Sequence, residues 1–359
     1  MLDLNTALQV SRPCSTILFM MKEARMAICE AEAARAGTAE LNADYPRDYF
    51  SAQPPASYTR DCTDIMGVLI DRTNRAQVLR QIDTFVRSGS PHQIVTVNVD
   101  FLNIAHQDHS FVRLLNDAAV SVPDGMPLLW VSRVVGQRLP ERITGTDLLC
   151  GCAELAAREG YRMFLLGAAP GVADHAAQVL TTRYPGLQIV GTYSPPEQGD
   201  FDADENARIV EVVRAARPDM LFVALGTPKQ EKWIYTNLQD LGVPVCIGVG
   251  GVFNFITGRI QRAPEAMQRA GMEWLFRLCL EPRRLWRRYL IDDTKALYRA
   301  MHYATRKRVR GLPGPVHTAP ITISRMPTAP AHPLLPDAPD WHLGTRDAVV
   351  SSVVGMPEA

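Results

Sequence analysis

The chain has 359 residues, of which 47% are hydrophobic and 21% are charged, as in a soluble globular protein with one α/β domain and tails or with two domains. Its 38 basic residues balance 38 acidic ones, so the net charge gives no indication of a nucleic-acid partner. No run of about 18 apolar residues occurs, so we expect no membrane-spanning helix.

The cysteines and the N-terminal region suggest a cytosolic location. The apolar run at residues 16–21 is too short for the core of a signal peptide. The seven cysteines are odd in number and scattered along the chain. Cys150 and Cys152 form a C-x-C pair in a helical pattern, but no second Cys/His pair follows at zinc spacing. We therefore expect reduced thiols.

The two ends of the chain differ in composition from its middle. Residues 1–60 combine a helical patch with a polar, proline-containing stretch, which predicts a mobile extension outside the core. Residues 311–359 hold 9 prolines in 49 positions with little periodicity, which indicates a disordered tail. We expect an α/β core at residues 61–258 and a basic helical appendage at residues 259–310.

Between these ends, strand and helix patterns alternate. Strands are predicted at residues 65–70, 93–100, 162–167, 187–193 and 220–225. Two further short strands are predicted, one that ends at residue 122 and one that ends just before residue 248. Helices are predicted at residues 73–89, 111–119, 126–135, 146–159, 171–184, 204–216 and from 228 onward. This alternation predicts an α/β fold with a mainly parallel sheet flanked by helices.

The segment at residues 218–255 contains one complete strand–helix–strand pattern. Its first strand is a continuous apolar run that ends at Gly226, and Pro228 fits the first turn of the helix. This places three polar residues at the carboxyl end of a strand and the amino end of a helix: Lys229, Gln230 and Glu231. Ligands bind at this edge of open α/β sheets, and helix amino termini favour phosphates, although an ordinary βαβ unit explains the same pattern.

Polar residues also follow other predicted strands. Alternation along the second predicted strand places Thr96, Asn98 and Asp100 on one face. Asp124 follows the next strand and Gln230 a later one, so all of them would line one cleft if these strand ends meet. Each also has a structural explanation, because Asn98 and Asp100 could cap the next helix and Asp124 could belong to a turn.

Six distinctive stretches of the core occur in this order: TVNVDFLNIA (96–105), VPDGMPLLW (122–130), ERITGTDLL (141–149), MFLLGAAPGV (163–172), PDMLFVALGTPKQEKWI (218–234) and GVGGVFNFITGRIQRAPEAMQRAGMEWLFRLCLEPRRLWRR (248–288). They resemble the WecG/TagA/CpsF glycosyltransferases, glycosyltransferase family 26, which have a Rossmann-like core. The resemblance runs from about residue 62 to residue 290 and leaves out both ends of the chain.

The resemblance implies inverting transfer of a hexose or N-acetylhexosamine from a UDP-sugar to a polyprenyl-diphosphate-linked glycan, in bacterial exopolysaccharide or cell-surface polysaccharide synthesis. It identifies Asp124 as the general base, which would take the proton of the acceptor hydroxyl. It also assigns residues to the sugar or nucleotide pocket: Thr96, Asn98, Arg142 and Gln230. The donor stays open among N-acetylmannosamine, its uronic acid and glucose, because epimers differ by one hydroxyl position.

Residues 259–310 carry 14 Lys and Arg against 5 Asp and Glu, a net charge of +9. The resemblance implies that Arg277, Arg284 and Arg287 contact the donor diphosphate, which guanidinium groups bind bidentately. Aromatic and aliphatic residues lie between these arginines, so the segment could dock the enzyme on the anionic inner face of the cell membrane. A solvated basic face and packing into the core are the alternatives.

Two overlapping D-x-D patterns, formed by Asp200, Asp202 and Asp204, could hold a metal ion for the leaving diphosphate. They directly precede a predicted helix, where acidic residues are expected as caps. The resemblance implies metal-independent enzymes, so we expect no cofactor.

Two other functions fit parts of the sequence. A catalytically silent nucleotide- or lipid-binding scaffold of a polysaccharide assembly complex would share the fold, but it would not need Asp124 together with the four pocket residues. A nicotinamide-dependent dehydrogenase would share the α/β pattern, but no G-x-G-x-x-G follows the first strand of a βαβ unit. A homo-oligomer is compatible with the sequence.

Overall fold

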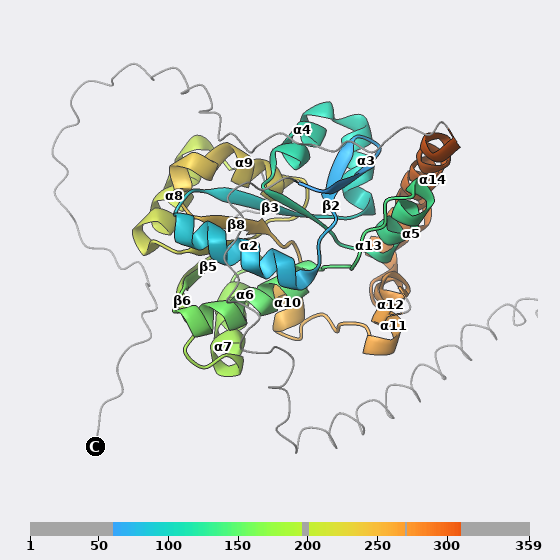
Figure 1. The fold of residues 1–359 in the computed structure, drawn as a ribbon. Helices are drawn as coiled ribbons and strands as arrows, with labels where there is room; N and C mark the ends of the chain where they lie inside the picture. The colour runs from blue at the N-terminus through green and yellow to red at the C-terminus, as the bar shows by residue number, and fades with distance from the viewer. Residues whose placement is uncertain (1–59, 196–200, 270, 310–359) are drawn as a thin grey trace, which may run out of the picture. The chain divides into compact units, whose positions relative to one another are not determined.

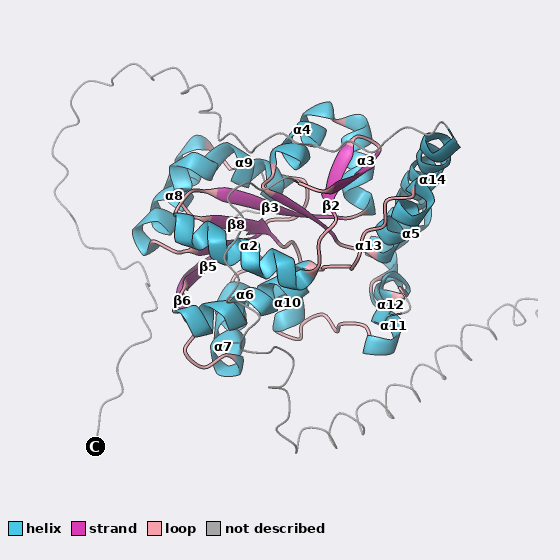
Figure 2. Cartoon of the chain, in the orientation of Figure 1, coloured by secondary structure: helices cyan, strands magenta, loops and turns pink. Residues whose placement is uncertain are grey.

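The computed structural model describes residues 60–195, 201–269 and 271–309, without the side chains of Glu265 and Arg269. The predicted extension up to residue 59 and the predicted tail lie outside the described residues, as does Asp200. Figures 1 and 2 show the described part as a central sheet with helices on both faces.

Six strands form one sheet in which every neighbouring pair is parallel. They are β3 (His92–Val97), β4 (Val120–Pro123), β5 (Arg162–Gly167), β6 (Gln188–Tyr193), β7 (Met220–Ala224) and β8 (Val245–Gly248). Their order across the sheet is β4-β3-β8-β7-β5-β6. The predicted Rossmann-like parallel sheet is confirmed, and the carboxyl ends of β3, β4, β7 and β8 lie along one edge.

Helices cover both faces of this sheet (Figure 2). One face packs against α2 (Arg75–Ser88), α6 (Gly145–Glu159), α7 (Val172–Arg183) and α10 (Val252–Ile256). The other packs against α3 (Val99–Gln107), α4 (His109–Asp117), α5 (Met126–Val135), α8 (Ala203–Ala216) and α9 (Lys229–Leu241). All five residues of β7 are buried, as expected for a continuous apolar strand that is covered on both faces.

The C-terminal segment is helical, as predicted. It contains α11 (Glu265–Arg269), α12 (Glu273–Leu280), α13 (Pro282–Arg287), a π-helical turn (Arg288–Asp292) and α14 (Asp293–Val309). α14 runs beside α5 (Figure 1), and Ala300 and Ala304 of α14 lie in one apolar cluster with residues of α5. Tyr303 and Lys307 each donate a hydrogen bond of 2.9 Å to the Asp64 carboxylate. The basic segment therefore ends in a helix that is packed on the core.

The predicted strand at residues 65–70 is wrong, because the structure has a hairpin there. β1 (Cys62–Ile65) and β2 (Val68–Asp71) form a separate two-stranded antiparallel sheet. The turn residues Met66 and Gly67 have φ angles of 57° and 86°, as a two-residue type I′ turn requires. The Asp64 side chain stabilises the turn by accepting a hydrogen bond of 2.8 Å from the Gly67 N–H.

The predicted strand at residues 93–100 ends early, at Val97. The Asn98 side chain accepts a hydrogen bond of 3.2 Å from the Phe101 N–H and begins α3, a helix that the sequence pattern did not reveal. Asp100 lies in the first turn of α3, so the prediction that it shares a strand face with Thr96 is wrong. The capping role that was the alternative for Asn98 is confirmed.

Candidate active site

A cavity of about 840 Å³ opens at the carboxyl edge of the sheet. One side of it comes from the segments that follow β3, β4, β7 and β8, and the other from α12, α13, the π-helical turn and the start of α14. The residues predicted for catalysis and for sugar or nucleotide binding all line this cavity: Thr96, Asn98, Asp124, Arg142 and Gln230. The parallel sheet brings them together because the carboxyl ends of its strands share one edge.

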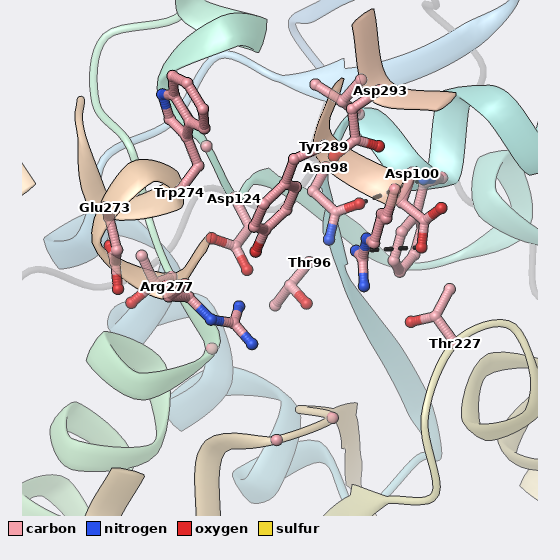
Figure 3. A pocket seen from close by; sticks show the side chains of 18 of the residues that line it. Thr96, Asn98, Asp100, Asp124, Thr227, Glu273, Trp274, Arg277, Tyr289 and Asp293 are labelled. Atoms are coloured by element: carbon pink, nitrogen blue, oxygen red, sulfur yellow. Dashed lines mark hydrogen bonds and ion pairs between the residues drawn. The ribbon is translucent and has the colours of Figure 1, made fainter. Parts of the chain in front are cut away.

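Asp124 is the first residue after β4. Its backbone N–H donates a hydrogen bond of 2.6 Å to the carbonyl of Val97, the last residue of β3, so two strand ends fix its position. Gly125 follows with a φ of 140°, which residues with a side chain rarely adopt, and leads the chain into α5. Figure 3 shows the Asp124 carboxylate pointing into the cavity, with Arg277 on one side and Asn98 on the other.

The environment of Asp124 changes its acidity. Burial raises the pKa of Asp124 to about 7, and the negative charge of Glu273 adds to this rise. The positive charges of Arg142 and Arg277 act in the opposite direction. A carboxyl group with a pKa close to the working pH can both accept and release a proton there, which suits a general base.

Arg142 is paired with a residue that the sequence analysis did not single out. Its Nη1 donates a hydrogen bond of 2.8 Å to Glu273 at the start of α12. Arg262 lies 3.0 Å from Asp147 on α6 and 3.9 Å from Glu273, so it joins the same group of charges. These ion pairs attach α12 to the loop before α6. They also place the Glu273 carboxylate in the cavity wall, close to Arg277 (Figure 3).

Thr96 and Gln230 are both buried and hold the loops that border the cavity. The Thr96 hydroxyl donates a hydrogen bond of 3.3 Å to the carbonyl of Gly248, at the end of β8. The amide oxygen of Gln230 accepts hydrogen bonds from the backbone N–H groups of Gly226, at 3.2 Å, and Gly250, at 2.9 Å. Gln230 therefore links the loop after β7 to the loop after β8.

The three arginines predicted to bind diphosphate occupy different environments. Arg277 lines the cavity, and its guanidinium carbon lies 5.3 Å from the centre of the Phe255 ring, in a cation–π contact. Arg284 also lines the cavity and pairs with Glu281. Arg287 is exposed and is not among the residues that line the cavity.

Arg288 lines the cavity instead, 3.1 Å from the Asp100 carboxylate on α3. α13 ends at Arg287, and the π-helical turn begins at Arg288. Arg287 and Arg288 lie three and four residues after Arg284, so helical spacing alone does not decide which of them faces the cavity. The contact between Arg288 and Asp100 also attaches the C-terminal segment to α3.

Asp202 and Asp204 of the D-x-D patterns have the structural role expected at the start of a helix. Asp202 accepts a hydrogen bond of 2.7 Å from the Glu205 N–H and begins α8, and Asp204 lies in the first turn of that helix. Neither lines the cavity. Within the described ranges, no group of three or more His, Cys, Asp or Glu side chains could hold a metal ion.

Apolar side chains on α12 and α13 are exposed at the surface: Trp274, Leu275, Leu280 and Trp286. Of these, only Trp274 lines the cavity. None of the helices in the described part of the chain is long and apolar enough to cross a membrane.

Comparisons with known proteins agree with the resemblance seen in the sequence. The family model described as "Glycosyl transferase WecG/TagA/CpsF family" matches residues 63–310. Relatives from Staphylococcus aureus strains NCTC 8325 / PS 47, COL and MRSA252 are each named N-acetylglucosaminyldiphosphoundecaprenol N-acetyl-beta-D-mannosaminyltransferase. Each is 32% identical to this chain over 226 residues, which cover 62% of this chain and 87% of the relative.

Proposed function

The chain belongs to the WecG/TagA/CpsF family of glycosyltransferases, and we propose that it transfers a sugar from a UDP-sugar to a polyprenyl-diphosphate-linked glycan with inversion at the anomeric carbon. The proposal rests on the position and acidity of the Asp124 carboxyl group. It lies at the strand edge in a cavity bounded by arginines, with its pKa raised to about 7. Such a group suits removal of a proton from an acceptor hydroxyl.

The relatives support a choice of acceptor and donor. Their name describes transfer of an N-acetyl-β-D-mannosaminyl group to N-acetylglucosaminyl-diphospho-undecaprenol. We therefore favour an acceptor in which a sugar is joined to a polyprenyl diphosphate, and a donor that carries N-acetylmannosamine. Glucose and the uronic acid of N-acetylmannosamine are the alternative donor sugars. The products would serve the synthesis of a bacterial exopolysaccharide or cell-surface polysaccharide.

In the proposed reaction, Asp124 takes the proton of the acceptor hydroxyl while that oxygen attacks the anomeric carbon of the donor. The new glycosidic bond forms as the bond between the anomeric carbon and the UDP oxygen breaks, and UDP leaves with the bonding electrons. Attack from the face opposite UDP inverts the configuration. The growing charge on the diphosphate needs cationic partners, a role that we assign to Arg277 and Arg284. Arg288 lines the cavity and is a better-placed third partner than Arg287.

We propose that the reaction takes place at the cytoplasmic face of the cell membrane, where the lipid-linked acceptor is embedded. The net charge of +9 on residues 259–310 supports contact with anionic lipid. Exposed Leu280 and Trp286 could enter the interfacial layer of the membrane beside these charges. The same segment lines the cavity, so docking would bring the site close to its acceptor.

The proposal is tested by incubating the purified full-length protein with a panel of UDP-sugars and a short-chain polyprenyl-diphospho-N-acetylglucosamine. Each UDP-sugar is assayed separately, so that mass spectrometry of the product shows which donors support transfer, and NMR of the product gives its anomeric configuration. We expect a β-linked product from an α-linked donor. An α-linked product would refute inversion, and UDP binding without transfer from any donor would favour the catalytically silent scaffold.

A further inference from the structure

The first turn of α9 contains two buried polar side chains, Gln230 and Glu231, with exposed fractions of 2% and 1%. The amide nitrogen of Gln230 donates a hydrogen bond of 2.6 Å to Oε1 of Glu231. Oε2 of Glu231 is buried and has no hydrogen-bond partner among the residues that the structure describes. A buried carboxyl group with one unpartnered oxygen is costly to fold, so its presence needs an explanation.

The amide oxygen of Gln230 accepts hydrogen bonds from the N–H groups of Gly226 and Gly250, which belong to two loops that line the cavity. An amide group has a donor end and an acceptor end of nearly the same size, so its orientation depends on its partners. If the amide turned over, its NH₂ group would face two backbone N–H donors and both hydrogen bonds to the loops would be lost.

Glu231 disfavours this rotation, because its Oε1 accepts a hydrogen bond from the NH₂ group of Gln230 and would face the amide oxygen after rotation. The contact with Glu231 and the two loop hydrogen bonds therefore favour the same orientation of the amide. We infer that Glu231 is a positioning residue, which fixes the amide of Gln230 and, through it, the two loops at the proposed sugar-nucleotide site. This inference rests on the proposed function.

Two further contacts fix Glu231 itself. A Cβ atom added at Gly248 would lie 2.8 Å from Oε1 of Glu231 and 2.8 Å from Nε2 of Gln230, so the pair packs directly against the end of β8. The side-chain amide of Gln93 on β3 donates a hydrogen bond of 3.1 Å to the Glu231 carbonyl. The start of α9 is thereby tied to two strands whose carboxyl ends border the cavity.

Two substitutions at this position separate the acceptor function from simple packing. Glu231→Gln can still accept from Gln230 through its amide oxygen, whereas Glu231→Met has a similar size but no acceptor. We expect Glu231→Met to lower kcat/KM by about 10²-fold, the scale of an ångström-sized misplacement in an active site. It should also weaken UDP binding and speed amide hydrogen exchange at residues 226–227 and 249–252. Glu231→Gln should stay within a few-fold of the wild type in all three measurements.

Two other variants control for general loss of stability. Asn237 lies on the same helix, away from the cavity lining, and its buried side chain donates hydrogen bonds to Asn206 and to the Trp233 carbonyl. Asn237→Leu removes these bonds, so it should lower Tm without changing hydrogen exchange in the two loops.

Gly248→Ala introduces a Cβ that would displace Gln230 and Glu231. It should reproduce the effects of Glu231→Met even if Glu231→Met folds poorly.

Equal loss of activity in Glu231→Gln and Glu231→Met, or wild-type kcat/KM and loop exchange in Glu231→Met, would overturn the inference. Hydrogen exchange and UDP binding need no turnover. If the wild type transfers no sugar, the proposed function fails, while the difference in exchange between the two variants still tests the role of Glu231.

Discussion

Arg142 and Glu273 form an ion pair of 2.8 Å that joins the loop before α6 to α12 in the wall of the cavity. The two residues act on the Asp124 carboxyl group in opposite directions, because Glu273 raises its pKa and Arg142 lowers it. The acidity of the proposed base therefore depends on a residue of the C-terminal segment. Removing the negative charge of Glu273 should therefore lower the pKa of Asp124.

Glu273→Gln should shift the pH dependence of transfer to lower pH. The substitution removes a negative charge near Asp124 and leaves Arg142 unpaired by a carboxylate, and both changes lower the Asp124 pKa. Because a general base acts in its ionised form, the acid limb of the pH profile of kcat/KM should move down by roughly 0.5–1 unit. Glu159→Gln is a suitable control, since Glu159 pairs with Arg87 and does not line the cavity. An acid limb that stays in place or moves to higher pH would show that Glu273 does not raise the pKa of the base.

Asp124→Asn should nearly abolish transfer while leaving UDP binding largely intact. The amide keeps the size and the backbone contacts of Asp124 but cannot take the proton of the acceptor. Loss of a general base costs about 10²–10⁴-fold in rate. The measurement is kcat with saturating substrates, beside UDP affinity from calorimetry. Wild-type turnover in this variant would remove Asp124 from the mechanism.

Asp124→Asn should also raise thermal stability, and more at pH 8 than at pH 5. The pKa of Asp124 is about 7 in the folded protein against an ordinary value of 3.8, so the folded state binds this proton more tightly than the unfolded state. That contribution to stability is complete below the unfolded pKa and is lost as the pH rises through 7. Asn carries no such dependence. The difference in Tm between variant and wild type should therefore grow with pH, and a constant difference would contradict the raised pKa.

Much of the sheet could be predicted from sequence because its strands are unbroken apolar runs. β5 and β7, for example, occur within one residue of their predicted bounds. The sequence left open whether the polar residues at separate strand ends meet, and in the structure Thr96, Asp124 and Gln230 line one cavity. The failures arose where a short turn or a helix cap interrupted such a run, as at the Met66–Gly67 turn and at the Asn98 cap.

The C-terminal half of the site was harder to predict. Glu273 is one of few acidic residues in a basic segment, and no local pattern shows that it returns to Arg142 on the core. Arg287 and Arg288 both follow Arg284 at helical spacing, and the contact of Arg288 with Asp100 on α3 distinguishes them. Both features depend on tertiary contacts between segments that lie far apart in the sequence.

Transfer should survive saturating EDTA, because the proposed mechanism offsets the diphosphate charge with arginines. Asp202 and Asp204 belong to the start of α8 and lie outside the cavity lining. The assay compares initial rates with EDTA and after addition of Mg²⁺ or Mn²⁺. Complete loss on chelation that either ion restores would overturn the arginine-only mechanism. Asp202→Asn would then test whether this residue holds the ion.

The proposed membrane contact is better tested by substitutions than by truncation, because truncation would also disturb the core. Removing the chain from Arg277 onward would also remove α14, whose Ala300 and Ala304 lie in the core. Leu280 and Trp286 are exposed at 46% and 50% and do not line the cavity. Changing both to Ser should weaken binding to anionic liposomes at least tenfold, since burying each side chain contributes on the order of 1–3 kcal/mol.

The double variant should keep its activity on a soluble short-chain acceptor and lose activity on a long-chain acceptor in vesicles. Tyr298→Ser provides the control, because Tyr298 on α14 is 73% exposed and lies outside α12 and α13. Liposome binding of the wild type should also weaken with salt, since exposed charges are screened over about 8–10 Å near physiological ionic strength. Equal liposome binding by the double variant and the wild type would show that α12 and α13 do not dock on the membrane.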